Sequence, residues 1–330
     1  SLNAQARDIV VELAARIRSA REGDRPRVIA FGAHAIKNCL SPVFTALMEE
    51  GWVTHLATNG AGIIHDWELA YQGATSEDVK ANVSDGCFGT WEETGYYLNL
   101  ALIVGAYEGL GYGESIGALV ENEKLTLPSR EMLEKRIPEW VAVEPDRASA
   151  AIDLLDAMRR FALPEGTMEV PHAHKAAGLQ AAAYRLGVPF TGHPMFGHDI
   201  HYEHALSLGA AIGRTAERDF LTFANAINRI DGGVYISLGS AVMSPMIFEK
   251  CFAMAQNVAL QNGKAISNHF MTVVDLAKSH WDWTRGEPPE NNPDYYLRYN
   301  KTFSRMGGAL RYVSLDHRDF LLALRQELKG

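Results

Sequence analysis

Short apolar runs alternate with amphipathic helical segments along most of the chain, and each run ends in a glycine or polar turn before a helical pattern begins. This alternation is typical of βαβ units, in which crossover helices cover a parallel sheet. The sequence therefore predicts an α/β fold: one large doubly wound, mostly parallel, Rossmann-like sheet with helices on both faces. The runs predicted to be strands are 27–33, 52–58, 188–192, 232–239, 264–274 and 310–316.

The remaining pattern is helical. Residues 1–24 predict an amphipathic N-terminal helix, and residues 75–185 predict a mainly helical insertion between the early and late strands. No Pro/Ser/Gly-rich linker interrupts the chain, so we expect residues 1–330 to form a single domain. The glycine-rich segment 109–117 follows a helical pattern, and its third required position is not glycine in either register of G-x-G-x-x-G. It predicts a helix–helix turn.

Composition narrows the possible partners. The net charge is −9 and no dense basic stripe is present, which argues against nucleic acid or an anionic membrane surface as a partner. The three cysteines lie far apart without a C-x-x-C pair, a usage that suits a reducing compartment. No apolar run approaches the length of a membrane span. We expect a cytoplasmic protein that binds a small molecule.

Glycine and polar residues gather where four of the predicted strands end, in segments 31–38, 58–66, 237–245 and 315–319. Ligands of open α/β sheets bind beyond the carboxyl ends of the strands, where such turns allow the backbone to approach them. Any one of these segments could be an ordinary turn. Together they favour a ligand the size of a nucleotide.

Two further segments could carry chemistry. Residues 193–204 contain four histidines together with Asp199 and Glu203, which could ligate zinc or iron, although their spacing matches no standard metal motif. The alternative is a loop whose polar groups cap a helix and line a pocket. In PDYYLRYNK (293–301), a dry pocket made by Tyr296 and Tyr299 would lower the pKa of Lys301 and make it a nucleophile or base.

These segments, in this order, resemble the deoxyhypusine synthase family over residues 27–325. The resemblance is carried by GAHAIKNCLSP, THLATNGAGIIHDWE, VPFTGHPMFGHDIHYEH, GGVYISLGSAV, AISNHF, PDYYLRYNK and VSLDHRDF. It implies a doubly wound NAD-binding fold and a homo-oligomer, a dimer or tetramer. It also implies that Lys301 forms an imine with the substrate and that Tyr299 stands beside it. The implied cofactor contacts are Gly32, Asn59, Gly60, Ala61, Gly239, Ser240 and Asn268, with Asp316 at the adenosine end.

The chain departs from the family where the synthases bind a polyamine. Ile64-His65-Asp66 replaces part of an acidic stretch, Leu208 and Arg214 stand where anions are expected, and Ser244 stands in place of a histidine. A cationic polyamine would lose most of its charge partners, and each buried unpaired charge costs several kcal/mol. The chain is therefore expected not to be a true deoxyhypusine synthase. A substrate with a carboxylate would suit Arg214 and Lys37.

The sequence thus predicts an NAD-dependent enzyme that oxidises an amine or amino acid transiently, with Lys301 capturing the carbon. His65 is the proton shuttle, because imidazole titrates near neutrality. Asp66 could instead be only a first-turn helix anion. A metal-dependent hydrolase or lyase using the 193–204 histidines, and a non-catalytic binding relative, are the alternatives. The expected substrate residues are Lys37, Asp66, Glu68, His193, Asp199, His201, Arg214 and Ser244, and no metal is expected.

Overall fold

The computed structural model describes residues 2–330, and the chain divides into two compact units. Unit 1 combines the residues up to Gly62 with Phe220–Gly330, and unit 2 is Ile63–Asp219. The chain passes from the first unit to the second within helix α4 (Gly60–Gln72) and returns within helix α11 (Gly209–Asn228). The expected helical insertion at 75–185 falls within unit 2.

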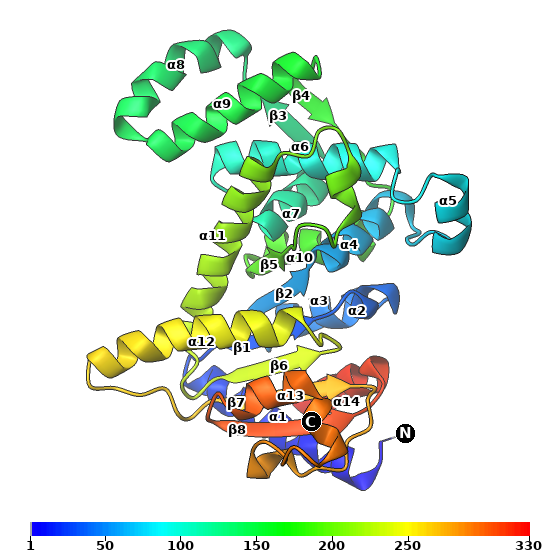
Figure 1. Cartoon of the computed structure of the whole chain (residues 1–330), viewed down its shortest axis with the longest axis vertical. Coiled ribbons are helices and arrows are strands. Elements are labelled where there is room, and N and C mark those ends of the chain that lie inside the picture. Colours follow the sequence, from blue (N-terminus) through cyan, green and yellow to red (C-terminus); the bar gives the residue numbers. More distant parts are fainter. Residues whose placement is uncertain (1) are drawn as a thin grey trace. The chain divides into compact units, whose positions relative to one another are not determined.

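Unit 1 contains five parallel strands (Figure 1). They follow the order β2-β1-β6-β7-β8. Every residue of β1 and β6 is buried, as expected for central strands covered on both faces. The strands are β1 (Arg27–Phe31), β2 (His55–Asn59), β6 (Val234–Leu238), β7 (Phe270–Asp275) and β8 (Ala309–Ser314).

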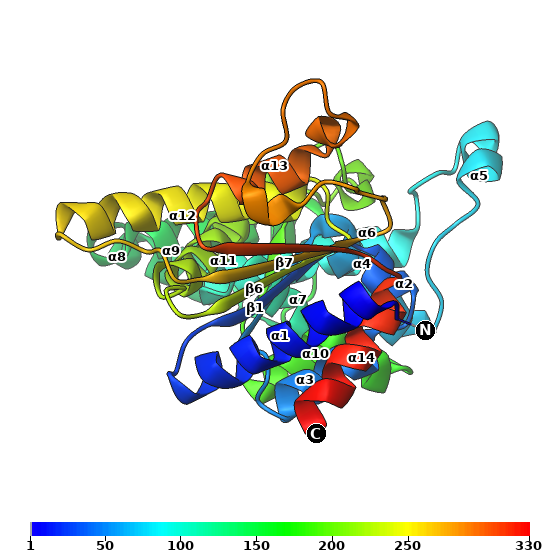
Figure 2. The ribbon, with the colours of Figure 1, turned by 90° about the horizontal axis from the view of Figure 1, so that it is seen from below.

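Helices cover both faces of these strands (Figure 2). On one face lie α1 (Ala4–Glu22), α3 (Ser41–Glu49) and α14 (His317–Lys329), and on the other lie α12 (Met243–Gln261) and α13 (Arg298–Ser304). The short helix α2 (His34–Lys37) follows β1. The predicted doubly wound α/β arrangement and the predicted N-terminal helix are confirmed.

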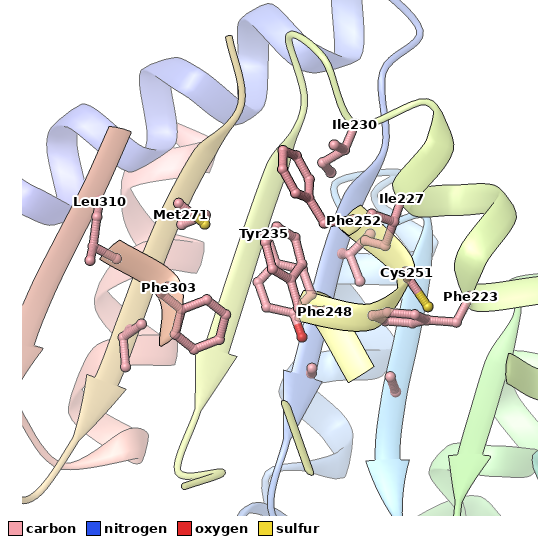
Figure 3. Packing of buried hydrophobic residues seen from close by; sticks show 14 of the residues in the cluster. Phe223, Ile227, Ile230, Tyr235, Phe248, Cys251, Phe252, Met271, Phe303 and Leu310 are labelled. Atoms are coloured by element: carbon pink, nitrogen blue, oxygen red, sulfur yellow. The ribbon is translucent and has the colours of Figure 1, made fainter. Parts of the chain in front are cut away.

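An aromatic core fixes α12 and α13 on the sheet (Figure 3). The ring of Tyr235 in β6 lies 4.4 Å from that of Phe248 in α12 and 5.8 Å from that of Phe303 in α13, measured between centroids. Phe303 is fully buried. Burying an aromatic side chain of this size stabilises a fold by several kcal/mol. Phe303 therefore anchors α13 on the sheet, two positions after the catalytic candidate Lys301.

Unit 2 is mainly helical and contains a two-stranded antiparallel hairpin, β3 (Lys124–Leu127) with β4 (Gly166–Glu169). A helix–helix turn lies where it was predicted but is shorter than 109–117, because α6 ends at Glu108 and α7 begins at Tyr112. The other elements are α5 (Val79–Asp85), α6 (Glu92–Glu108), α7 (Tyr112–Asn122), α8 (Arg130–Val143), α9 (Pro145–Arg160), α10 (Leu179–Leu186) and β5 (Phe190–His193).

Helix α4 begins earlier than its sequence suggests. It starts at Gly60, directly after β2, because the side chain of Asn59 accepts a hydrogen bond from the N–H of Gly62 at 3.0 Å and so caps the first turn. His65 and Asp66 therefore lie in the second turn, and the alternative that Asp66 is a first-turn helix anion was wrong. Within residues 2–330, no helix is both long and apolar enough to cross a membrane.

Candidate functional site

The carboxyl ends of the unit 1 strands form the first part of the candidate site. The strand order reverses at β1, which has β2 on one side and β6 on the other. Ligands of doubly wound sheets bind beside such a reversal. Gly32 follows β1 and Gly239 follows β6, and a Cβ on Gly32 would lie 2.1 Å from the carbonyl oxygen of Gly239. Only glycine fits at position 32, because the two turns approach so closely.

His317 completes this edge, although the sequence did not single it out. Gly239 has φ +57°, and a Cβ there would lie 2.2 Å from Cε1 of His317. Glycine at position 32 thus allows the two turns to pack together, and glycine at position 239 allows the imidazole of His317 to pack against its turn. His317 is 7% exposed, and its Nε2 has no hydrogen-bond partner among the described residues. Burial lowers the pKa of His317, so the ring is neutral near pH 7. A buried, unsatisfied ring nitrogen at this edge is suited to a polar ligand.

Four of the predicted cofactor contacts lie at the starts of helices here. The first-turn N–H groups of α4, at Gly60 and Ala61, have no carbonyl partner within the helix, and a helix N-terminus attracts phosphate. Ser240 accepts a hydrogen bond from the N–H of Ser244 at 3.1 Å. Asp316 caps α14 through the N–H of Arg318, whose guanidinium holds the pKa of Asp316 well below its usual range. All lie at the carboxyl ends of the strands.

Asn268, a cofactor contact implied by the resemblance, lies at the opposite edge of the sheet from the other predicted contacts in unit 1. Its backbone carbonyl accepts the N–H of Gly232 at 2.8 Å, and its own N–H donates to Asp231 at 2.8 Å. Gly232 precedes β6 and Asn268 precedes β7, so both lie at the amino ends of the strands. The strand expected from residue 264 begins only at Phe270. The predicted strand was too long at its start, because its apolar pattern was extended into the preceding loop.

Lys301 is paired with a carboxylate that the sequence did not indicate. Its Nζ lies 3.0 Å from Oε1 of Glu287 and 3.2 Å from the ring centroid of Tyr295. Partial burial alone would lower the pKa of Lys301, but the contacts with Tyr295 and Glu287 raise it above its ordinary value. The expected lowered pKa was wrong, because Glu287 comes from the preceding loop and its approach depends on tertiary structure.

The aromatic neighbours of Lys301 also differ from the prediction. Tyr296 is 72% exposed, and the hydroxyl of Tyr299 lies 3.5 Å from that of Tyr312 in β8. Tyr295 takes the place beside the ammonium that was assigned to Tyr299. On a helix, residues two apart point in different directions, which is why Tyr299 and Lys301 in α13 have different partners.

Hydrogen bonds to Asp294 hold the long loop before α13 in place. The carboxylate of Asp294 accepts hydrogen bonds from the hydroxyl of Ser279 at 3.0 Å and from the backbone N–H groups of His280 and Trp281 at 2.8 and 2.7 Å. Trp283 is buried in the unit 1 core. These contacts hold the segment that carries both Glu287 and Tyr295.

The pKa of Lys301 should respond to the charge of Glu287. In Glu287→Gln the anion that favours the ammonium is gone, so we expect the pKa of Lys301 to fall. Arg305, whose Nε donates to Oε2 of the same carboxylate at 2.7 Å, provides the control. Arg305→Gln removes a competing cation and should leave the pKa of Lys301 unchanged or higher. The pKa of Lys301 is measured from the rate of its acetylation as a function of pH, followed by mass spectrometry. A pH profile that is unchanged in Glu287→Gln would contradict the pairing of Lys301 with Glu287.

In unit 2, His65 and Glu68 form a hydrogen-bonded network. Nδ1 of His65 lies 2.6 Å from the hydroxyl of Thr75, which donates to Glu68, and Thr94 donates to the other carboxylate oxygen at 3.0 Å. Burial alone would raise the pKa of Glu68, but the hydrogen bonds from His65, Thr75 and Thr94 lower it, so the carboxylate is ionised. An imidazole beside an ionised carboxylate is suited to general acid–base catalysis. The sequence did not indicate either threonine.

Asp66 has a structural role. One oxygen accepts the N–H of Leu179 and the other accepts that of Gln180, both at 2.8 Å, at the start of α10. The Gln180 side chain adds a third bond at 3.1 Å. Asp66 is 1% exposed. The carboxylate therefore caps α10 instead of its own helix, and its expected role in substrate binding is not supported.

The histidines of residues 193–204 do not converge. Nε2 of His193 lies 2.9 Å from the hydroxyl of Thr191, and Nε2 of His201 lies 3.1 Å from that of Tyr112. Burial lowers the pKa of His201 to about 4. Asp199 accepts the hydroxyl of Tyr202 at 3.0 Å, and His204 pairs with Glu92 at 3.3 Å. No three potential metal ligands gather anywhere in residues 2–330, so the metal-dependent alternative lacks a ligand set.

Two other predicted substrate residues already have protein partners. The guanidinium of Arg214 donates to Asp146 at 2.9 Å and to Asp153 at 3.1 Å, so its charge is neutralised by α9. The hydroxyl of Ser244 lies 2.9 Å from that of Tyr235 and is fully buried. Lys37, in contrast, is exposed in α2 at the carboxyl end of β1 and makes no ion pair with any residue in 2–330.

No family model and no curated protein sequence match this chain. The deoxyhypusine synthase resemblance therefore stays a prediction. Similar solved structures include a conserved putative LOR/SDH protein from Methanococcus maripaludis S2, with 14% identity, a TM-score of 0.49, and coverage of 98% of this chain and 67% of that one.

Two more similar structures are longer proteins. ArgZ, an arginine dihydrolase from the ornithine–ammonia cycle in cyanobacteria, is 14% identical with a TM-score of 0.47, and the match covers 100% of this chain and 33% of ArgZ. The ternary complex of AgrE with ornithine and NAD+ is 12% identical with a TM-score of 0.46, over 100% of this chain and 34% of AgrE. This chain thus spans about a third of either protein, and likenesses this distant carry no conclusion about its activity.

Proposed function

We propose that this chain is an NAD-dependent enzyme that acts on an amine or an amino acid. The observation that carries the proposal is the carboxyl edge of unit 1, where the strand order reverses and Gly32, Gly239 and the unsatisfied Nε2 of His317 come together. The N–H groups of Gly60 and Ala61 would receive a phosphate, and the carboxylate of Asp316 would accept ribose hydroxyls.

NAD, when bound, would supply a hydride acceptor for the substrate carbon that bears nitrogen. Lys301, as a free amine, would then add to that oxidised carbon. A bond forms between the carbon and Nζ while the bond to the original nitrogen breaks, and that nitrogen leaves with the proton that Lys301 gives up. Glu287 lies 3.0 Å from Nζ and is placed to hold this proton in transit.

Lys301 rests as an ammonium, since its pKa is raised. The imine step therefore requires a change at Glu287 when substrate binds, such as replacement of Lys301 by a substrate cation. In unit 2, His65 stays the candidate for proton transfer that the sequence predicts, and its partner Glu68 would stabilise the imidazolium. Lys37 is the remaining cation for a substrate carboxylate, and this favours an amino acid over a polyamine.

Binding of NAD to the purified chain tests the cofactor assignment. We expect calorimetry to give a dissociation constant below about 0.1 mM, or NAD to be released when the protein is denatured. Absence of binding at millimolar NAD would overturn the proposal.

Borohydride trapping in the presence of NAD, with a panel of amines and amino acids, tests the lysine assignment. We expect a reduced adduct on Lys301, identified by mass spectrometry and absent in Lys301→Ala. Lys264→Ala, at an exposed loop position, is the matched control and should keep the adduct. An adduct that persists in Lys301→Ala would exclude Lys301 as the imine-forming residue even if NAD binds.

A further inference from the structure

Helix α12 has apolar side chains on two opposite faces. Phe248, Cys251, Phe252 and Ala255 face the unit 1 core. On the other side, Val242, Met246, Met254 and Val258 are 46–58% exposed, although they are large and apolar. Single exposed apolar residues are common on protein surfaces, but a contiguous row marks an interaction surface. Figure 2 shows that α12 lies in the outer layer of unit 1, with the sheet on only one side of it.

The exposed row repeats every four residues and is symmetric. Val242, Met246, Lys250, Met254 and Val258 read the same in both directions about Lys250. Residues four apart form a ridge on a helix, and two such ridges pack at a crossing angle of about −50°. If two copies of α12 cross antiparallel at Lys250, Met246 of each copy meets Met254 of the other. The row is therefore complementary to itself, as a two-fold symmetric interface requires.

The charges at the centre also suit a second copy. Glu249 precedes Lys250, and the two side chains form an ion pair on the helix surface. Across a two-fold axis, Lys250 of each copy reaches Glu249 of the other, so the like charges at the axis both find an opposite charge.

We propose that α12 is a dimer interface, in which it pairs antiparallel with α12 of a second copy of this chain about an axis at Lys250. A single helix pair covers less than the roughly 1,200–2,000 Å² of a standard interface. We therefore expect a dissociation constant on the order of micromolar for the helix pair alone, and a tighter one if neighbouring segments add contacts.

Cysteine cross-linking tests the register. In a background with the two exposed cysteines, Cys39 and Cys87, replaced by serine, Lys250→Cys should cross-link to itself through a short bismaleimide. Met246→Cys and Met254→Cys should each self-link poorly, and should link to one another when the two proteins are mixed. Val11→Cys, at an exposed position of α1, is the control and should stay unlinked. Self-linking of Met254→Cys without linking of Lys250→Cys would overturn the antiparallel register.

Sedimentation velocity tests the association itself. Met254→Glu should weaken dimerisation at least tenfold while the circular dichroism stays native, because two buried carboxylates would face the apolar row. Val83→Glu on α5, at a position that is also exposed and apolar, should leave the association unchanged. A wild-type chain that is monomeric at all concentrations, or a dimer that Met254→Glu does not weaken, would overturn the proposal. Neither the cross-linking nor the sedimentation experiment depends on cofactor binding, so failure of the dimer proposal can be told apart from failure of the proposed function.

Discussion

Replacing Gly32 by alanine is expected to lower the free energy of unfolding by about 3 kcal/mol and to reduce NAD affinity at least tenfold. The new Cβ would lie 2.1 Å from the carbonyl oxygen of Gly239. That oxygen cannot move freely, because the N–H of Gly239 donates to the carbonyl of Val274 at 2.9 Å and so ties the turn to β7. The β1 and β6 turns must separate, and they form the edge to which we assign the cofactor.

Chemical denaturation and calorimetry measure the two effects of Gly32→Ala. Gly213→Ala is the matched control, since a Cβ at this position in α11 would meet nothing within 4 Å. Alanine favours a helix over glycine by up to about 1 kcal/mol, so the control should be neutral or slightly stabilising. If Gly32→Ala keeps both stability and NAD affinity, the close approach of the two turns is wrong and the assigned edge with it.

Replacing Asp66 by alanine is expected to lower the free energy of unfolding by about 3–5 kcal/mol. The carboxylate accepts two backbone N–H groups at the start of α10, and these buried donors would have no acceptor after the change. Hydrogen exchange should show α10 losing protection first. This outcome would establish Asp66 as a cap, in place of the substrate contact that the sequence suggested.

Glu68→Gln is the control for this second experiment. Glu68 is also a buried carboxylate of α4, but its partners are side chains, namely the hydroxyls of Thr75 and Thr94 and the imidazole of His65. Hydroxyl groups rotate to find new partners and backbone N–H groups do not, so the loss of stability should be smaller. If Asp66→Ala keeps its stability, the capping role is refuted and a functional role for Asp66 returns.

Much of unit 1 could be predicted from the sequence. The alternation of buried runs and amphipathic helices determined the parallel strands and the helices on both faces, because burial on both faces requires continuous apolar strands. Residues attached directly to a strand end were also located correctly. Gly32, Gly239 and Asp316 all lie at the carboxyl edge, since in a parallel sheet every strand ends on the same side.

The partners of charged side chains could not be predicted in this way. Glu287 lies 14 positions before Lys301 in the sequence, and only the fold of the loop around Asp294 brings it to the ammonium and raises the pKa of Lys301. Arg214 was expected to bind a substrate carboxylate, yet its guanidinium forms ion pairs with two aspartates of α9. The periodic pattern of a helix or strand predicts which way a side chain points, but it does not predict which residue from another part of the chain contacts that side chain.

The turn that contains His317 also shows which features follow from the sequence alone and which depend on the tertiary structure. The sequence by itself determined a polar turn after β8, in which Asp316 was the residue with a recognisable role. Only the tertiary structure decided that the neighbouring imidazole packs against Gly239 with an unsatisfied Nε2. Strand and helix periods are local properties that few residues encode, whereas the approach of two turns depends on every element packed between them.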